Sequence, residues 1–316
     1  MRASWTEMVL FVQVALVGLM MGLLLLAGVV AQAGIVAGRG SIAYVSEQDG
    51  NPEIYLLDID RAYLRRLTRH AAADRRPAWS PDGRAISFYS NRHNGRWNIY
   101  LMQASGSRVR QITDTDGRDG NLAWSPDGRY VAFDSTRSGN LEIYVMEAAC
   151  MDAPTTCAPR RLTNHAAADR YPTWSPDGRY LLFESVRYEY YDIFRIRADG
   201  RDLTRLTRNT IPDWGANWSP DGTQIAFASS RGASWDIYVI PAACEGLVGG
   251  CEGEARLLIE HPHDDSLPQW SPDGRYLLFE SWIDDNFELF IAAADGSGLQ
   301  RLTFNRADDT QAVWWP

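Results

Sequence analysis

The phrase Trp-Ser-Pro-Asp-Gly recurs along this 316-residue chain and constrains the fold more than any other feature. Five full copies and a shortened sixth copy occur, at Trp79–Gly83, Trp124–Gly128, Trp174–Gly178, Trp218–Gly222, Trp270–Gly274 and Trp314–Pro316. The repeated tryptophans are separated by 45, 50, 44, 52 and 44 residues. Repeats of about 40–50 residues that each carry strands and turns are typical of propellers. The spacing therefore predicts a propeller with one blade per copy.

Each copy is expected to form the hairpin turn between the first and second strands of a blade. Proline presets φ for the turn, and glycine accepts the positive φ that returns the chain to a strand. An alternating apolar segment follows, and two further strand-like segments complete the repeat. The expected second strands are Ser41–Ser46, Ala85–Ser90, Tyr130–Ser135, Tyr180–Ser185, Gln224–Ser229 and Tyr276–Ser281. Four strands in each of six repeats predict a six-bladed ring.

The two ends of the chain complement each other. The first repeat starts at its second strand, Ser41–Ser46, whereas the chain ends with a lone first strand, Gln311–Trp315. Pairing of these strands would complete a blade and remove the exposed edges that a sheet must otherwise protect. The predicted fold is therefore an all-β, six-bladed β-propeller over residues 37–316, closed by the C-terminal strand and preceded by one N-terminal hydrophobic helix.

The order of motifs within each repeat resembles the TolB-like, WD40-like PD40 propeller family. Arg-Leu-Thr, an acidic loop, Pro-x-Trp-Ser-Pro-Asp-Gly-Arg, an apolar-x-Phe-x-Ser strand and Ile-Tyr recur in that order, with minor variation. The resemblance covers essentially everything after residue 40. TolB members of the family carry an α/β domain before the propeller, whereas about forty residues precede it here. The resemblance implies a propeller that binds another protein.

The N-terminal segment is strongly apolar. Residues 8–30 are apolar except for Gln13, and about twenty such residues span a bilayer. We therefore expect residues 1–36 to contain a transmembrane anchor. Ala31–Ala33 has the small-x-small form of a cleavage site, so a cleaved signal peptide is the alternative. A buried core helix is a third interpretation, but a closed propeller offers no place for one.

The four cysteines predict the compartment. They form two pairs that both read Ala-Ala-Cys-x6-Cys, at Cys150, Cys157, Cys244 and Cys251. Each pair lies in an insertion between the third and fourth strands, so two local disulfides are the economical interpretation. Metal ligation is the rival, but the pairs are two blades apart and lack CxxC spacing. Because disulfides are typical of oxidising compartments, we expect a periplasmic or cell-surface propeller, anchored to the cytoplasmic membrane by residues 8–30.

An Asp stands five residues before every repeat Trp and is the only charged position kept in all six copies: Asp74, Asp119, Asp169, Asp213, Asp265 and Asp309. Four repeats also carry an Arg two residues after the Ser of the second strand: Arg92, Arg137, Arg187 and Arg231. The structural interpretation is a repeated Asp–Arg pair, or an Asp that accepts backbone N–H bonds in its own loop. The functional interpretation is an acidic channel mouth that binds a cation or a basic group of a partner.

Aromatic residues that break the repeat are candidates for a contact surface, because aromatic side chains are enriched in interface hot spots. These residues are Tyr188, Tyr190, Trp214 and Trp282. A different position, nine residues before the Trp, holds a His in alternate repeats and Thr or Asn in the others: His70, Thr115, His165, Asn209, His261 and Asn305. We expect a hydrogen-bonding loop residue there and no metal site, because the position lies at the rim, where ligands cannot converge.

The remaining sequence favours a binding protein over an enzyme. There is no Gly-x-Ser-x-Gly elbow and no evident nucleophile–base pair. The net charge of −9 and the lack of a basic run argue against nucleic acid as a partner. We expect a non-catalytic, extracytoplasmic protein-binding propeller that acts as an envelope scaffold or as an accessory subunit of a membrane-associated complex. No cofactor is expected, apart from a cation if the channel holds one. The alternative is a carbohydrate-active lyase or hydrolase that uses the channel face.

Overall fold

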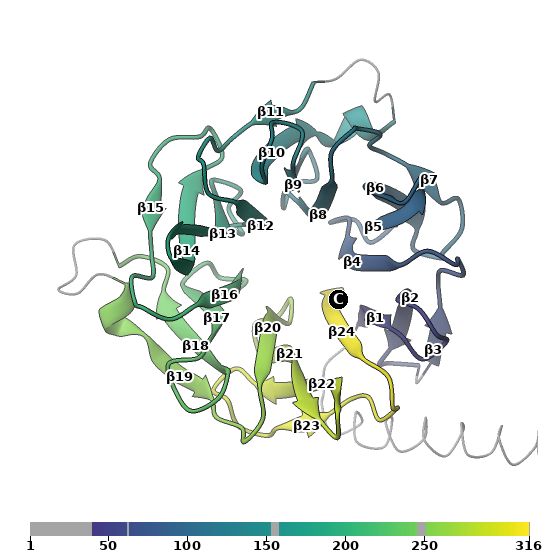
Figure 1. Ribbon diagram of the computed structural model, residues 1–316. Helices are drawn as coiled ribbons and strands as arrows, with labels where there is room; N and C mark the ends of the chain where they lie inside the picture. The colour runs from purple at the N-terminus through teal and green to yellow at the C-terminus, as the bar shows by residue number, and fades with distance from the viewer. Residues whose placement is uncertain (1–39, 62, 153–157, 245–250, 316) are drawn as a thin grey trace, which may run out of the picture.

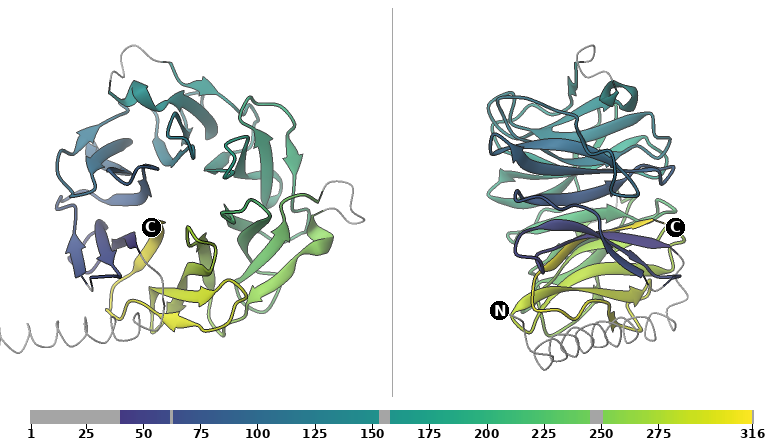
Figure 2. Two further views of the ribbon diagram at one scale, coloured as in Figure 1. Left: turned by 180° about the vertical axis from the view of Figure 1, so that it is seen from behind. Right: turned by 90° about the vertical axis from the view of Figure 1, so that its right-hand side faces the viewer.

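The structure is a computed structural model that describes residues 40–61, 63–152, 158–244 and 251–315. Six four-stranded antiparallel sheets surround a central axis (Figure 1), so the predicted all-β, six-bladed propeller is confirmed. In the side view of Figure 2 the strands run between the two faces of the ring. The expected N-terminal helix falls within residues 1–39, outside the described residues. No helix in the described part is long and apolar enough to cross a bilayer.

The innermost strand of every blade begins at the repeated Asp. We number the blades in the chain order of their second strands, so that blade 1 contains both the first and the last described strands. The innermost strands of blades 2 to 6 are β4 (Asp74–Trp79), β8 (Asp119–Trp124), β12 (Asp169–Trp174), β16 (Asp213–Trp218) and β20 (Asp265–Trp270), and that of blade 1 is β24 (Asp309–Trp315). From blade 1 to blade 6, the second strands are β1 (Ser41–Ser46), β5 (Ala85–His93), β9 (Tyr130–Ser135), β13 (Tyr180–Tyr188), β17 (Gln224–Ser229) and β21 (Tyr276–Ile283). The six predicted second strands are thus confirmed, and three of them continue beyond the expected Ser into their hairpins.

The outer two strands complete each blade. The third strands are β2 (Glu53–Asp58), β6 (Arg96–Gln103), β10 (Glu142–Glu147), β14 (Tyr190–Arg197), β18 (Asp236–Pro241) and β22 (Asn286–Ala293). The outermost strands are β3 (Tyr63–Arg66), β7 (Arg110–Gln111), β11 (Arg160–Arg161), β15 (Thr204–Arg205), β19 (Arg256–Ile259) and β23 (Gln300–Arg301). Short 3-10 helices η1 (Ala148–Met151) and η3 (Glu252–Glu254) lie in the insertions of blades 3 and 5.

The core lies between neighbouring blades, because each sheet is apolar on both faces. Phe88 of β5 is 1% exposed and packs in a cluster with Ala43 and Ile54 of blade 1. Phe183 of β13 packs in the same way against Ile143 of blade 3. The apolar-x-Phe-x-Ser strand therefore holds adjacent blades together.

The repeated phrase forms the predicted turn. The backbone N–H of Gly83 donates to the carbonyl of Ser80 (2.9 Å), and Gly83 has φ 67°. The Ser80 hydroxyl donates to Asp82 Oδ1 (2.6 Å), which also accepts the backbone N–H of Arg84 (3.1 Å). Ser80, Asp82 and Gly83 thus have local structural roles, and the same contacts recur in the other four full copies.

The two chain ends close the ring as predicted. Strand β24 pairs antiparallel with β1, with Ser41 opposite Trp315 and Ser46 opposite Asp309. Next to this pair, Ile42 and Trp314 join a cluster that also contains residues of blade 6. Blade 1 therefore combines the first described strands of the chain with its last one.

One of the two expected disulfides lies within the described residues. Cys244 and Cys251 are bonded in the insertion of blade 5, and both are buried. Cys150 is also buried, in blade 3, whereas its expected partner Cys157 falls outside the described residues.

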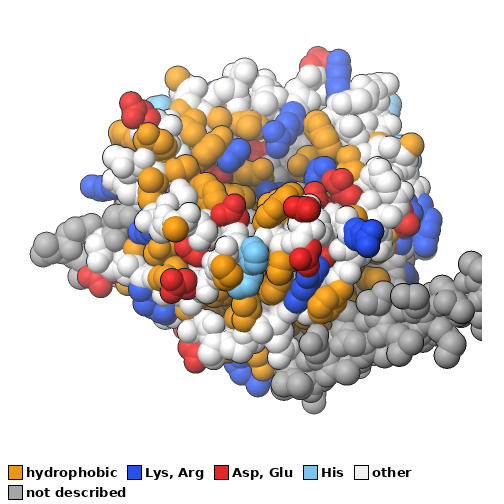
Figure 3. All heavy atoms as spheres, turned by 60° about the horizontal axis from the view of Figure 1, so that its bottom comes forward, with side chains coloured by type: hydrophobic (Ala, Val, Ile, Leu, Met, Phe, Trp, Pro, Cys, Tyr) orange, Lys and Arg blue, Asp and Glu red, His pale blue; other side chains and the backbone are white. Residues whose placement is uncertain are grey.

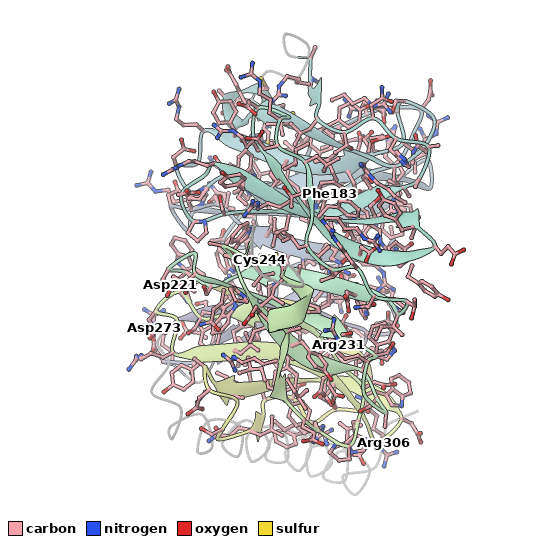
Figure 4. All side chains as sticks on the ribbon, turned by 90° about the vertical axis from the view of Figure 1, so that its left-hand side faces the viewer. Phe183, Asp221, Arg231, Cys244, Asp273 and Arg306 are labelled. Carbon is pink, nitrogen blue, oxygen red and sulfur yellow. A yellow bond between two sulfur atoms is a disulfide. The ribbon has the colours of Figure 1, made fainter. Side chains whose placement is uncertain are left out.

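The loops that join the strands lie on two opposite faces of the ring. Figure 4 shows Asp221 and Asp273, of two repeated turns, at one edge of the ring, with Arg306 near the opposite edge and Arg231 toward that side. We call the first side the turn face and the second the loop face. The loops that precede the repeated Asp residues, and the hairpins between second and third strands, both lie on the loop face.

Substitution of Gly83 tests the closure of the ring. A Cβ at Gly83 would lie 2.4 Å from Cε2 of Trp315, the last described residue of β24. Gly95 has a similar φ of 70° but no atom within 4 Å of such a Cβ. We expect Gly95→Ala to lower the free energy of unfolding by about 1 kcal/mol through backbone strain. Gly83→Ala should cost about 1–3 kcal/mol more, because of the clash. Equal losses in chemical denaturation would contradict packing of Trp315 on this turn.

Candidate functional site

The six repeated Asp residues are all completely buried, although the functional interpretation expected them at a channel mouth. Each one is the first residue of an innermost strand and lies opposite the last residue of the regular part of the second strand, as Asp74 lies opposite Ser90. Burial of a carboxylate is costly unless a cation or several donors compensate it. The surroundings of these Asp residues therefore decide what they do.

Four of the six are paired with the predicted Arg. The distances from Arg Nη2 to the nearest carboxylate oxygen are 2.6 Å for Arg92–Asp74, 3.0 Å for Arg137–Asp119, 2.5 Å for Arg187–Asp169 and 3.1 Å for Arg231–Asp213. Each guanidinium also lies over two core rings, as Arg92 lies 5.2 Å from Phe88 and 4.9 Å from Tyr100. These contacts support the structural interpretation for four blades. A role of the Asp and Arg residues in binding a cation or a partner stays a prediction.

Asp265 and Asp309 have no Arg counterpart. Burial, together with the nearby negative charges of Asp236 and Asp264, raises the pKa of Asp265 to about 7. Burial likewise raises the pKa of Asp309 to about 7, with a further contribution from Glu288. The polar neighbours are weak compensation: His261 Nδ1 lies 3.6 Å from Asp265, and Asn305 donates to Asp309 (2.6 Å). Both carboxyls therefore gain or lose a proton near neutral pH.

Replacement of both carboxyls by amides should make the fold less sensitive to pH. A folded-state pKa near 7 exceeds the value of about 4 in the unfolded chain. The two carboxyls thus stabilise the fold most below about pH 4, and this stabilisation is lost as the pH rises to about 7. The Asp265→Asn/Asp309→Asn variant should melt at least about 3 °C above the wild type at pH 8. The two proteins should melt together at pH 4, as calorimetry can check.

Asp119→Asn is the matched control, because Asp119 occupies the same position in its repeat but is paired with Arg137. Removal of one partner of a buried ion pair leaves the other charge uncompensated, at a cost of about 3 kcal/mol. This variant should therefore melt below the wild type at pH 8. The account would be contradicted if the double variant also melted at or below the wild-type temperature at that pH.

The hydrogen bonding predicted for the histidine position is present. His70 Nδ1 accepts the backbone N–H of Ala72 (3.0 Å), and His165 Nδ1 accepts that of Ala167 (3.0 Å). Asn305 Oδ1 accepts the backbone N–H of Ala307 in the same way (2.7 Å). The position thus serves to order its loop. Among the described residues, no group of three or more His, Cys, Asp or Glu side chains could hold a metal ion.

A bulge near the axis interrupts every innermost strand. The residue two positions after the repeated Asp has a positive φ in all six blades: Arg76, Asn121, Tyr171, Gly215, Leu267 and Gln311. A bulge of this kind turns the backbone N–H out of the ladder and re-aims the side chain. The side chains of Arg76, Asn121, Tyr171 and Leu267 at this position line a cavity on the axis.

Carboxylates from the preceding blade accept several of the freed N–H groups. Glu184 of β13 accepts the N–H of Gly215 (2.6 Å), and Glu280 of β21 accepts that of Gln311 (3.0 Å). Asp134 of β9 accepts that of Tyr171 (3.1 Å). Sequence reasoning missed these three buried carboxylates. The available signal was an acidic residue directly before the repeated Ser, within a strand that is otherwise buried.

A cavity of about 360 Å³ lies along the axis, between the bulges and the repeated turns. Residues of all six innermost strands line it. Arg76 and Tyr171 lie at the end formed by the bulges, whereas Pro81, Pro126 and Trp315 lie at the end formed by the turns. The walls are mainly apolar, which is typical of a ligand pocket.

The aromatic candidates lie on the loop face, over blades 4 to 6. Tyr188 is 56%, Trp282 41% and Tyr190 39% exposed, whereas Trp214 is partly buried against Trp235, with ring centroids 5.7 Å apart. Sequence reasoning missed Phe304, which is 41% exposed in the loop before β24. The only signal for Phe304 in the sequence is that the other five repeats have a polar residue at the same position, ten residues before the repeat Trp. We call these residues the aromatic surface: Tyr188, Tyr190, Trp214, Trp282 and Phe304.

Acidic side chains accompany the aromatic surface. Exposed acidic residues in the loops of blades 4 to 6 on this face are Glu189, Glu260, Asp264, Asp284 and Asp285. Exposed basic residues in the same loops are Arg208 and Arg306. Figure 3 shows hydrophobic, acidic and basic side chains interspersed on the surface that comes forward when the lower edge of Figure 1 is turned toward the viewer. This half of the face is therefore both apolar and acidic.

Comparison with protein families gives a consistent match. The model of the PD40 family, described as the TolB beta propeller domain, matches residues 37–121, 112–207 and 155–248. Tol-Pal system protein TolB of Geobacter sulfurreducens is 45% identical over 47 residues, which are 15% of this chain and 11% of that protein. The protein of the same name in Syntrophus aciditrophicus is 49% identical over 35 residues, or 11% of this chain and 8% of its own length. The matches thus span about a tenth of these curated relatives.

Solved structures of low sequence identity share the fold. TolB from Acinetobacter baumannii has a TM-score of 0.72 at 24% identity, over 87% of this chain and 66% of that one. Putative TolB from Agrobacterium tumefaciens has a TM-score of 0.67 at 21% identity, over 88% of this chain and 99% of that one. Hydrazine synthase of Kuenenia stuttgartiensis has a TM-score of 0.70 at 15% identity, over 88% of this chain and 47% of that one. Because the family model matches more than half of the sequence, the chain belongs to the TolB beta propeller (PD40) family.

Proposed function

We propose that this protein is an extracytoplasmic protein-binding propeller whose partner docks on the aromatic surface. It would act as an envelope scaffold or as an accessory subunit of a membrane-associated complex. The curated relatives are named as proteins of a Tol-Pal system, which supports a role within a protein assembly. The observation that carries the proposal is the exposure of Tyr188, Tyr190 and Trp282 on one half of one face.

Three large aromatic rings exposed on one half of one face, those of Tyr188, Tyr190 and Trp282, are unusual on a surface that contacts only water. Trp282 packs edge-on against Phe287, with centroids 5.0 Å apart, and Tyr188 lies under the guanidinium of Arg205 at 4.1 Å. These contacts hold the rings in place while one side of each stays in water. Large, preordered aromatic side chains lose little entropy on binding and are enriched in interface hot spots. They therefore suit the centre of a docking site.

Charge indicates the chemistry of the partner. The acidic residues around the rings favour a partner that presents Lys or Arg beside apolar side chains, because complementary charge steers association and excludes wrong partners. The buried Cys244–Cys251 disulfide supports an oxidising compartment. In this proposal the apolar segment of residues 8–30 holds the propeller at the cytoplasmic membrane, which would place a membrane-associated partner within reach.

Alanine substitution of Tyr188, Tyr190 and Trp282 tests the docking site. A tagged full-length chain would be used to capture proteins from detergent-solubilised membranes of its own organism. We expect the wild type to retain a protein in stoichiometric amount and the triple variant to retain at least about tenfold less. Loss of a hot-spot side chain costs about 2 kcal/mol or more. Capture should also weaken as the salt concentration rises, because the charged groups at the rim are screened.

Tyr63→Ala is the matched control, because Tyr63 is 51% exposed but lies on the outermost strand of blade 1. It should retain the partner at the wild-type level. The proposal fails if the triple variant melts like the wild type and still captures the same protein in full. It also fails if Tyr63→Ala reduces capture as much as the triple substitution does.

A further inference from the structure

Arg76 occupies the most unusual position near the axis. It is the bulge residue of β4, with φ 52°, and its backbone N–H donates to Gln311 Oε1 of blade 1 (2.8 Å). Its guanidinium lies over the ring of Tyr171, 4.4 Å from the centroid. Because Arg76 belongs to blade 2 and Tyr171 to blade 4, this contact reaches past the innermost strand of blade 3. The pair therefore lies at the end of the axial cavity that the bulges form.

No described residue gives the guanidinium of Arg76 a hydrogen bond or an ion pair, and its Nε atom is buried without an acceptor among those residues. A buried donor left unpaired is costly, and more so when it carries a charge. An unpaired buried group in a native fold therefore requires an explanation, such as an absent ligand.

Glu184 and Glu280, two carboxylates near Arg76, do not supply that partner. Glu184 is bonded to Arg170 (3.0 Å) and to the N–H of Gly215, and Glu280 accepts the Ser266 hydroxyl (2.9 Å) and the N–H of Gln311. Burial lowers the pKa of Arg76, but the nearby tyrosines, Glu280 and Glu184 raise it by more, so the guanidinium stays charged. These carboxylates act on Arg76 at a distance and leave its N–H groups available.

The shape of the site indicates the ligand. A guanidinium stacked on an aromatic ring keeps its in-plane N–H groups free, and these match the two oxygens of a carboxylate. The rest of the cavity is lined by apolar groups that include Trp79, Trp124, Trp174 and Trp270. A volume of about 360 Å³ falls in the range of small-molecule pockets. We propose that the axial cavity binds a carboxylate attached to an apolar or aromatic group, with Arg76 as the residue that holds the carboxylate.

Two sources could supply this chemistry: a free aromatic acid, or the C-terminal carboxylate of a peptide that ends in an apolar residue. The site is independent of the proposed docking surface, because the cavity extends from the bulges toward the turn face. Titration calorimetry and tryptophan fluorescence of the full chain would follow binding. The probes are 3-phenylpropionate and a tetrapeptide ending in Phe, each compared with its amide.

We expect at least one acid to bind at least tenfold more tightly than its amide, and the acid that does so identifies the source. Arg76→Met should abolish this preference. Arg76→Lys, which keeps the charge that faces Glu184 and Glu280, should melt like the wild type and still weaken binding at least tenfold. Arg84→Ala is the matched control, because the Arg84 side chain is 88% exposed beside the turn of the same blade, and it should bind normally.

Three results would overturn the proposal. One is the absence of binding of both acids to the wild type at millimolar concentration. Another is equal affinity for each acid and its amide, which would make the site merely apolar. The third is unchanged acid binding by a folded Arg76→Lys or Arg76→Met variant. None of these results depends on capture of a protein by the aromatic surface, so the two proposals fail separately.

Discussion

The antiparallel pairing of β24 with β1 is the interaction on which the rest of the structure depends. It joins the last described strand to the first and completes blade 1, with Ser46 opposite Asp309. Only a closed ring places the six innermost strands around one axis and gives each blade a neighbour on both apolar faces. The axial cavity, the contacts between bulges and carboxylates of neighbouring blades, and the continuous loop face all require that closure.

Within the closed ring, the four blades that carry the Asp–Arg pair differ from blades 6 and 1, which lack the Arg. The Asp–Arg pairs, such as Asp74 with Arg92, recur with the same geometry and fix the loop ends of four blades. Blades 6 and 1 lack that Arg and keep Asp265 and Asp309 in a less favourable state. Exposed aromatic residues occur in the loop-face loops of blades 4 to 6, partly overlapping the blades that lack Arg. These two kinds of departure from the repeat therefore occur in four contiguous blades, blades 4 to 6 and blade 1.

Much of the fold could be predicted, because it depends on local patterns that repeat at a fixed spacing. The turn at Trp79–Gly83, the strand order and the closing strand follow from the repeat. The Asp–Arg pairing was one of two interpretations, but the complete burial of the Asp side chains was not predicted. No pattern indicated the bulge, since its residue varies from Arg76 to Gly215. The bond between Glu184 and Gly215 joins two blades, so only the assembled ring brings these residues together.

Amide hydrogen exchange of the full chain, resolved by peptide or by residue, tests the closed ring most directly. If β24 and β1 are paired, the amides of Ser41–Ser46 and Thr310–Trp315 that bond across this interface should exchange as slowly as the corresponding amides of blades 2 to 6. They should exchange only through global unfolding. Fast exchange confined to these two segments, with the other blades protected, would show that blade 1 is open and would contradict the account.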